Sequence, residues 1–245
     1  EAQSYPDRYL IINTLGTYSL LNAMKKASVR RLVFASSSAV YGNPSNSSVA
    51  SERTLTVPSE VYGASKFAAE TVIQSFCKYH ALTAVALRFF NVAGAAGKEI
   101  GEHHVPETHL VPRLIQAAMT GEPFEIYGED YPTLDGTCVR DYVHVEDIAR
   151  AHELAGIFTK THMGFTAINL GTGNGYSVME VVSAVERVTG QRVALVSRPR
   201  RPGDVAARVS SNEKAKLLLN WAPTKDIDDM VRSAYEWHMS LTTHA

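Results

Sequence analysis

Cysteine is scarce in this sequence, and the features that mark secreted, membrane and nucleic-acid-binding proteins are missing. Its 245 residues include two cysteines, Cys77 and Cys138, too few for a disulfide framework, so we expect a reducing, cytoplasmic location. We find no apolar run long enough to cross a bilayer and no recognisable signal peptide. The net charge of −1 gives no general attraction to nucleic acid or to an anionic membrane. We therefore expect a globular protein that binds neither.

Short apolar runs alternate with helical patterns along the chain. Hydrophobic residues make up 45% of the sequence, enough for one substantial core or one core with a smaller lobe. Apolar spacing predicts helices over residues 11–26, 59–80, 110–120, 145–157, 212–219 and 226–241. Strands are predicted over residues 31–35, 84–90, 124–127, 139–145, 167–170 and 193–197. This order indicates parallel strands joined by right-handed crossovers, and the predicted fold class is α/β.

The stretch from Tyr62 to Lys66 carries the clearest chemistry. On a helix these two side chains, four residues apart, project from one face. A neutral tyrosine is a weak base with a pKa near about 10, and a neighbouring ammonium group would lower that pKa. Ser36 and Ser37 follow a predicted strand, and such strand ends gather active groups. We predict a general acid/base unit for a hydroxyl or carbonyl substrate. The alternative is an ordinary helix with a packed tyrosine and a solvated lysine.

Two glycine-containing stretches have some of the features of nucleotide-binding loops. Residues 171–175 do not have the Gly-x-Gly-x-x-Gly spacing or a following acidic ribose ligand, so we predict a plain turn. Residues 94–98 are too short for a phosphate loop, and Glu99 stands where Ser or Thr would bind magnesium. Ser177 and Glu180 predict a capping box at the start of the next helix.

The loop 93–112 concentrates imidazole and carboxylate groups. These are Glu102, His103, His104, Glu107 and His109. The loop has no His-x-x-x-His on a helix and no cysteine partner, so we predict no metal site and favour a loop beside the substrate.

Three arginines, Arg198, Arg200 and Arg201, form a basic loop in a nearly neutral protein. Solvated surface arginines are one interpretation. The functional alternative is a two-armed clamp with Arg140 on a diphosphate, because the guanidinium fork matches phosphate oxygens.

These stretches together make the sequence similar to the extended short-chain dehydrogenase/reductases, and among them to the UDP-glucose (UDP-galactose) 4-epimerase family. The matching stretches run in order along the chain: residues 34–42, Tyr62 with Lys66, 87–91, 127–142, 143–147, 169–171 and 200–204. The resemblance implies the carboxyl-terminal portion of a Rossmann-like doubly wound parallel sheet that binds NAD, residues 1–92 with 139–171. It also implies a smaller α/β lobe that binds a UDP-sugar, residues 93–138 and 172–245.

The resemblance assigns roles to single residues. Tyr62 is implied to be the catalytic base, with Ser37 and Lys66 assisting it. The positions implied to contact NAD are Asn13, Ser37, Tyr62, Lys66 and Phe90. The positions implied to bind the UDP-sugar are Asn91, His109, Glu125, Tyr127, Arg140, Arg201 and Asp204. In this scheme Arg140 and Arg201 hold the diphosphate, Asp204 the nucleotide ribose, and Tyr127 lies near the base. The implied activity is NAD-dependent interconversion of UDP-glucose and UDP-galactose by transient oxidation at C4.

The sequence departs from this family at two places. The family begins with a strand and a Gly-x-x-Gly-x-x-Gly loop, so we expect activity to need an amino-terminal NAD-binding part that is not in these residues. Arg208 stands where the family lines the sugar pocket, which puts N-acetylated sugars in question. The alternatives are a UDP-pentose 4-epimerase and a truncated, non-catalytic UDP-sugar-binding module. The resemblance also implies a homodimer through the helices near Asn13 and Tyr62.

Overall fold

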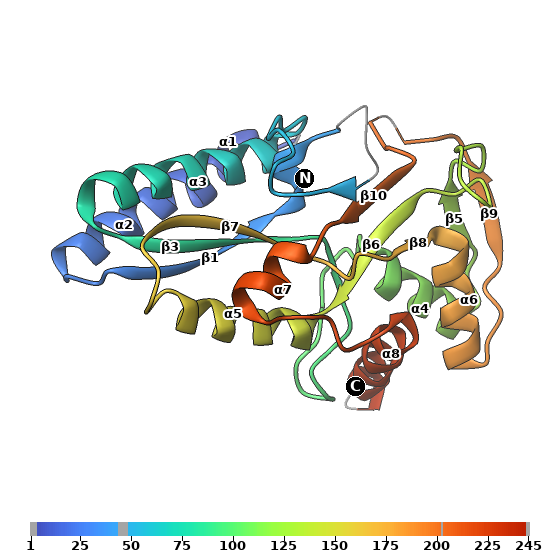
Figure 1. Ribbon diagram of the computed structural model, residues 1–245. Coiled ribbons are helices and arrows are strands. Elements are labelled where there is room, and N and C mark those ends of the chain that lie inside the picture. The colour runs from blue at the N-terminus through green and yellow to red at the C-terminus, as the bar shows by residue number, and fades with distance from the viewer. Residues whose placement is uncertain (1–3, 44–48, 202, 244–245) are drawn as a thin grey trace. The chain divides into compact units, whose positions relative to one another are not determined.

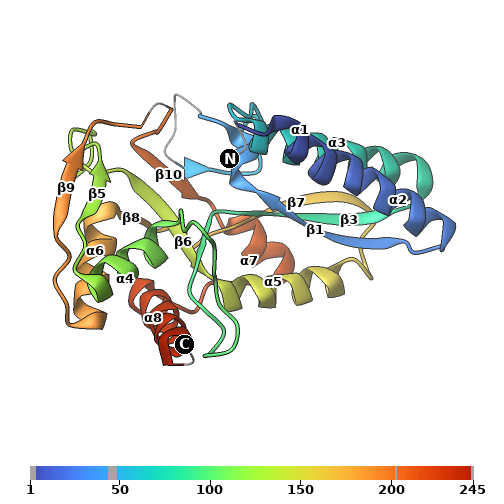
Figure 2. The same cartoon turned by 180° about the vertical axis from the view of Figure 1, so that it is seen from behind.

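The computed structural model describes residues 4–43, 49–201 and 203–243, and it divides the chain into two compact units (Figures 1 and 2). Unit 1 comprises Glu1–Phe90, Arg150–Leu170 and Ser210–Ala222, and unit 2 comprises Asn91–Ala149, Gly171–Val209 and Pro223–Ala245. Both units combine helices with parallel strand pairs, which confirms the α/β fold class. Residues 44–48, and Pro202 of the matching stretch 200–204, lie outside the described residues.

A three-stranded parallel sheet forms the centre of unit 1. Its strands are β1 (Arg31–Ser37), β3 (Thr83–Phe89) and β7 (Gly164–Leu170), in that spatial order. Residues 84–88 of the middle strand are all buried, as expected for a strand covered on both faces. The register places Ser37, Phe89 and Leu170 in one row, so the three strands end together.

Helices cover both faces of this sheet. They are α1 (Pro6–Tyr9), the π-helical turn η1 (Leu10–Leu15), α2 (Gly16–Lys26), α3 (Val61–His80), most of α5 (Val145–Phe158) and α7 (Glu213–Leu219). Figures 1 and 2 show α2 and α3 along one face of the sheet, and α5 and α7 along the other. Leu21 and Met24 of α2 pack with Ile73 of α3 in a core that includes Leu82 and Ala84. A 3-10 turn, η2 (Ser38–Tyr41), follows β1, and the short strand β2 (Val49–Ala50) precedes α3.

The amino-terminal helical segment exposes most of the apolar residues that predicted it. Leu21 is 1% exposed, whereas Ile11, Leu15 and Tyr18 are 56%, 57% and 49% exposed. The predicted helix is therefore present, but its apolar pattern is only partly explained by the core of unit 1.

Unit 2 is built on strands of a second sheet. Its strands are β4 (Asn91–Ala93), β6 (Val139–His144), β8 (Gly175–Ser177) and β10 (Ala207–Ser210), and a separate parallel pair is formed by β5 (Phe124–Tyr127) and β9 (Leu195–Arg198). Strand β6 pairs in parallel with β4 and β10, and antiparallel with β8. Three helices, α4 (Leu110–Thr120), α6 (Val178–Thr189) and α8 (Ile227–Thr243), pack against one another around a core that includes Leu114, Ile115, Val181, Val185 and Met230.

The structure divides the chain differently from the predicted domain boundaries, most of all at two segments. Residues 139–149 were expected with the NAD-binding part, but they lie in unit 2 because Tyr142, Val143 and His144 pair with β4. Residues 210–222, expected in the substrate lobe, lie in unit 1. The functional roles of the two parts stay predictions.

The local prediction at the start of α6 is confirmed. Ser177 Oγ accepts from the Glu180 amide at 3.1 Å, and the Glu180 carboxylate accepts from the Ser177 amide at 2.7 Å, which completes the capping box. Among the helices of the described residues, none combines the length and apolar character needed to cross a membrane.

Candidate active site

The predicted acid/base residues lie together in unit 1. Ser37 ends β1, and Tyr62 stands in the first turn of α3. The Ser37 side chain lies near the Tyr62 hydroxyl and favours its ionised form, which lowers the pKa of Tyr62. Lys66, one turn further along α3, has its Nζ atom 5.9 Å from the centre of the Tyr62 ring. The structure therefore brings the three predicted catalytic residues into one cluster at the end of a strand.

Gly63 allows α3 to approach the segment that follows Ser37. A Cβ atom at position 63 would lie 2.4 Å from the carbonyl oxygen of Ala39, closer than side-chain carbons come to backbone oxygens. Glycine at this position thus has a steric reason, because any larger residue would push the start of α3 away from η2. Gly63, which lies between Tyr62 and Lys66 in the sequence, is therefore part of the site geometry.

The electrostatics of Tyr62 differ from the sequence-based expectation. Burial raises the pKa of Tyr62 above its ordinary value, and the Ser37 side chain opposes this rise only in part. The expected lowering by Lys66 is not found, because Lys66 lies over the ring and donates from Nζ to the Ala35 carbonyl oxygen at 3.0 Å. Burial also lowers the pKa of Lys66. In this structure Tyr62 is accordingly a neutral phenol at neutral pH.

The two further residues predicted to contact NAD also lie in unit 1. Asn13 is in η1, and its Nδ2 atom donates to Ser65 Oγ at 2.9 Å, which ties this segment to α3. Phe90 follows β3, is 6% exposed, and donates from its backbone amide to the Leu170 carbonyl oxygen at 3.0 Å. Hydroxyl and ammonium groups at Ser37, Tyr62 and Lys66 suit the hydroxyls of a ribose, so this donor set fits a nicotinamide nucleoside.

Unit 2 holds the residues predicted to bind the UDP-sugar. Arg140 of β6 donates from Nη2 to the Asp204 carboxylate at 3.0 Å. Its Nη1 atom donates to the carbonyl oxygens of Val139 and Val205, at 2.8 and 2.9 Å. These contacts fix the guanidinium group, so Arg140 and Asp204 form one preorganised ion pair.

The predicted basic loop separates into arginines with different partners. Arg198 donates to Glu125 at 2.8 Å, and Arg200 donates to Asp130 at 2.7 Å. Arg201 lies instead over the ring of Tyr127, with its guanidinium carbon 4.1 Å from the ring centre. The structure thus distinguishes the predicted ligand Arg201 from its two neighbours.

Glu125 and Tyr127 are joined by a hydrogen bond between their side chains. The Tyr127 hydroxyl donates to Glu125 Oε2 at 2.6 Å, and both residues belong to β5. Together with Arg201 they form a small polar and aromatic surface at the edge of the β5–β9 pair. Asn91, by contrast, opens β4 and pairs in register with Tyr142 of β6.

His109 lies at the amino-terminal cap of α4 and pairs with Glu102. That contact raises the pKa of His109, because the carboxylate favours the imidazolium. Glu107 accepts hydrogen bonds from the backbone amides of Thr108 and His109, at 2.7 and 2.9 Å. Among the described residues, Glu102, His104, Glu107 and His109 place one ligand atom each within 4.8 Å of one another. This geometry could admit a cation, so the absence of a metal site stays a prediction.

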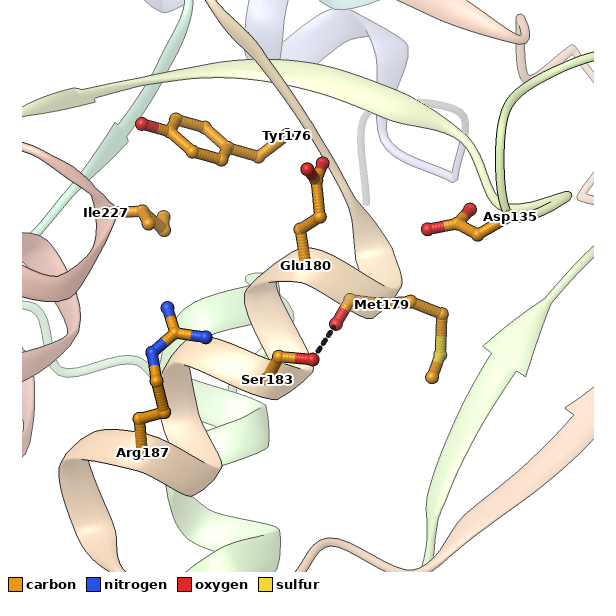
Figure 3. Close-up of a pocket in the computed structure, with 7 residues that line it drawn as sticks. All are labelled: Asp135, Tyr176, Met179, Glu180, Ser183, Arg187 and Ile227. Atoms are coloured by element: carbon orange, nitrogen blue, oxygen red, sulfur yellow. Dashed lines mark hydrogen bonds between the residues drawn. The ribbon is translucent and has the colours of Figure 1, made fainter.

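A hollow of about 430 Å³ in unit 2 contains none of the predicted site residues. It is lined by Asp135, Tyr176, Met179, Glu180, Ser183, Arg187 and Ile227 (Figure 3). Ser183 Oγ donates to the Met179 carbonyl oxygen at 2.9 Å, as the dashed line shows. Arg187 pairs with Asp228 and Glu180 with Ser177, so these charges serve the structure of unit 2.

Comparison with known proteins places these features in a family. Residues 1–171 match the NAD dependent epimerase/dehydratase family. The chain belongs to this family. The UDP-glucose 4-epimerase of Lacticaseibacillus casei is 43% identical over 241 residues, which cover 97% of this chain and 72% of that protein. The prediction of NAD as cofactor is confirmed for the family by its dependence on NAD.

Solved structures agree with this assignment. A UDP-glucose 4-epimerase from Stenotrophomonas maltophila, with bound NAD and formylated UDP-arabinopyranose, has a TM-score of 0.96 at 37% identity and covers 100% of this chain and 74% of its own. One from Bifidobacterium longum, in complex with NAD+ and UDP, has a TM-score of 0.88 at 35% identity and covers 99% of this chain and 73% of its own. The chain thus spans about three quarters of the length of these relatives, and the expectation that activity needs a further amino-terminal part stays a prediction.

Proposed function

We propose that the protein interconverts UDP-glucose and UDP-galactose by transient oxidation at C4 of the sugar. The cluster of Ser37, Tyr62 and Lys66 is the observation that carries this proposal. It supplies a phenol, a hydroxyl and an ammonium group at the end of a parallel strand, as alcohol oxidation by a general base requires. Similarity to UDP-glucose 4-epimerases over 97% of the chain supports the choice of substrate.

In the proposed reaction the Tyr62 phenol first releases its proton to solvent, and the resulting phenolate removes the proton of the sugar 4-hydroxyl. NAD, when bound, supplies an acceptor for the C4 hydride and a donor for its return. Ser37, beside the Tyr62 hydroxyl, would share the proton being transferred, and Lys66 would hold positive charge beside the ring while Tyr62 is a phenolate. The keto sugar then turns and accepts hydride on its other face, while Tyr62 gives the proton back. No net oxidation results.

Residues of unit 2 are proposed to hold the UDP part throughout this cycle. The Arg140–Asp204 pair would bind phosphate and ribose, and Arg201 would bind the second phosphate above Tyr127. Asn91, His109 and Glu125 complete the proposed ligand set. Firm anchoring of the diphosphate suits this mechanism because the sugar must turn while the nucleotide stays in place.

A UDP-pentose 4-epimerase is the second candidate. A specific observation favours it, since the Stenotrophomonas structure holds a formylated UDP-arabinopyranose. Arg208 of β10 pairs in register with Arg140 and is half-buried. Substitution of Arg208 would test whether this residue decides the acceptance of N-acetylated sugars. A third candidate is a UDP-sugar-binding module without catalysis. In that case the unit 2 residues would bind the UDP-sugar, and the Tyr62 cluster would not catalyse its conversion.

Two properties of the molecule as a whole belong to this proposal. A homodimer would cover the exposed side chains of Ile11, Leu15 and Tyr18. A cytoplasmic location is consistent with Cys77 and Cys138, which are both free thiols.

The experiment supplies NAD and follows UDP-galactose by NMR, with UDP-arabinose in parallel. We expect formation of UDP-glucose by the native chain and a rate at least about 100-fold lower for Tyr62→Phe. Conversion of the pentose alone would favour the second candidate. If neither sugar is converted while UDP still binds, the result would favour the UDP-sugar-binding module. Release of NAD from the purified protein on denaturation tests whether the chain holds its cofactor.

A further inference from the structure

A row of polar side chains crosses the sheet of unit 1, one residue before the strands end. Ser36, Arg88 and Asn169 are register partners on β1, β3 and β7. Their exposed fractions are 2%, 5% and 0%. Polar groups at such depth are costly unless each has a hydrogen-bond partner, so their contacts call for an explanation.

Glu70 of α3 is the main partner of this row. Its side chain is fully buried and receives two parallel hydrogen bonds from Arg88, Nε to Oε1 at 3.0 Å and Nη2 to Oε2 at 2.6 Å. Ser36 Oγ donates to the same Oε1 atom at 2.5 Å. A forked pair of this kind fixes both distance and direction, unlike an apolar contact.

Tyr41 and Asn169 complete the network on its other side. Arg88 Nη1 donates to the Tyr41 hydroxyl at 2.9 Å, and that hydroxyl donates to Asn169 Oδ1 at 2.6 Å. Asn169 Nδ2 donates to the Ala50 carbonyl oxygen at 3.0 Å, and its amide donates to Glu52 at 2.7 Å. Arg88 and Glu70 thus belong to a connected and satisfied set of hydrogen bonds.

Glu70 lies in the same row of α3 as Tyr62 and Lys66, at intervals of four residues. The helix meets β1 three times along this row. Tyr62 contacts Ser37, Lys66 contacts the Ala35 carbonyl, and Glu70 contacts Ser36. The first two contacts belong to the catalytic cluster, and the third is the deepest.

We propose that the buried Glu70–Arg88 pair, with Ser36, fixes the position of α3 along β1 and so holds Tyr62 opposite Ser37. Glu70 and Arg88 are positioning residues, because they act on the reaction through Tyr62 and Lys66. The catalytic consequence rests on the proposed function, whereas the placement of Tyr62 does not.

Stability alone does not explain this choice of residues. A buried ion pair is often no more stabilising than well-packed apolar residues of similar volume, although removal of one partner is strongly destabilising. Apolar side chains at positions 70 and 88 could give a stable contact between α3 and the sheet. They would not fix the helix along its axis as the forked hydrogen bonds do.

A double-mutant cycle separates position from stability. The variants are Glu70→Met, Arg88→Met and the double variant, with Ile73→Val as a control in the apolar face of the same helix. Three quantities are measured: urea unfolding, the ionisation of Tyr62 by NMR of 13C-labelled tyrosine, and kcat and KM for UDP-galactose. The Tyr62 signal is assigned by its loss in Tyr62→Phe.

We expect each single variant to lose stability and the double variant to recover most of it. The double variant should nevertheless ionise Tyr62 at higher pH, because displacement of α3 weakens the Ser37 contact that lowers this pKa. Its kcat should fall about 10- to 100-fold with KM within about 2-fold, as for a small misplacement of a catalytic group. Ile73→Val should change stability without moving the Tyr62 titration.

A double variant that recovers stability together with native Tyr62 ionisation would overturn the proposal. If the single variants at positions 70 and 88 do not fold, Ser36→Ala tests the same contact while keeping the ion pair. We expect a smaller upward shift of the Tyr62 pKa in this variant. An unchanged Tyr62 titration would contradict the proposal. Absence of epimerase activity in the native chain would refute the proposed function alone, because the Tyr62 titration still reports the position of α3.

Discussion

Lys66 donates a hydrogen bond from Nζ to the carbonyl oxygen of Ala35 at 3.0 Å, and the same ammonium group lies 5.1 Å from the centre of the Phe34 ring. The lysine is therefore held by β1 as well as by its own helix. Its charge is placed beside Tyr62 before any ligand binds, which is the preorganisation that acid/base catalysis uses.

Lys66→Met should reduce kcat for UDP-galactose by about 10²- to 10⁴-fold, because the proposed reaction needs negative charge on Tyr62 and the variant removes the neighbouring ammonium group. Lys78→Met is the matched control, since Lys78 lies near the other end of α3 and contacts the Tyr79 ring. Steady-state kinetics with saturating NAD would test both variants. Equal losses in the two would contradict a specific role for Lys66.

Much of the fold was predictable because the longer elements have clear apolar periods. The predicted ranges 110–120 and 124–127 coincide with α4 and β5. The short strands β4, β8 and β10 have three or four residues, too few for alternation to show, and their pairing moved residues 139–149 into unit 2. Pairing between distant segments is decided by packing that the local pattern does not contain.

The candidate site was predictable in its members but less so in its physics. The row of Tyr62 and Lys66 is visible in the sequence as a four-residue spacing, and Glu70 continues that spacing, but its burial is a property of the folded chain. The predicted direction of the shift in the Tyr62 pKa was wrong. Burial raises this pKa, and burial is a property of the folded chain that the sequence pattern does not contain. The partners of Arg198 and Arg200 were likewise hidden, since Glu125 and Asp130 are about 70 residues away in sequence.

Cys77 should react slowly with alkylating agents in the folded protein. Burial raises the pKa of its thiol to about 11, so the thiolate fraction at pH 8.5 should be roughly 100-fold below that of an ordinary cysteine. The raised pKa also stabilises the fold below about pH 9, a contribution lost as pH rises toward 11. Iodoacetamide labelling of Cys138→Ser, followed by mass spectrometry with and without urea, measures this. Labelling as fast in the folded state as in urea would contradict it.

Ser177→Ala should lower the free energy of unfolding by about 1 kcal/mol, the usual cost of losing an amino-terminal cap. The Ser177 hydroxyl also contacts Asp135, so the loss should lie toward the upper part of the known range. Urea denaturation followed by circular dichroism would give the value. Ser183→Ala is a suitable control, because its hydroxyl bonds the Met179 carbonyl within the same helix, and it should change stability by a few tenths of a kcal/mol.

Arg201→Met should weaken UDP binding by about 10- to 100-fold, the effect of losing a hydrogen bond to a charged phosphate. Arg200→Met is the control that makes this specific, because Arg200 already pairs with Asp130 and lies 4.2 Å from the centre of the Tyr131 ring. Removing it takes the same charge from the same loop, so a purely electrostatic effect would weaken binding equally in both variants. Isothermal titration calorimetry with UDP at two salt concentrations distinguishes the cases. A loss confined to Arg201→Met, and largely retained at high salt, would identify Arg201 as a direct ligand of the diphosphate, whereas equal, salt-sensitive losses would reduce the loop to a general field of positive charge.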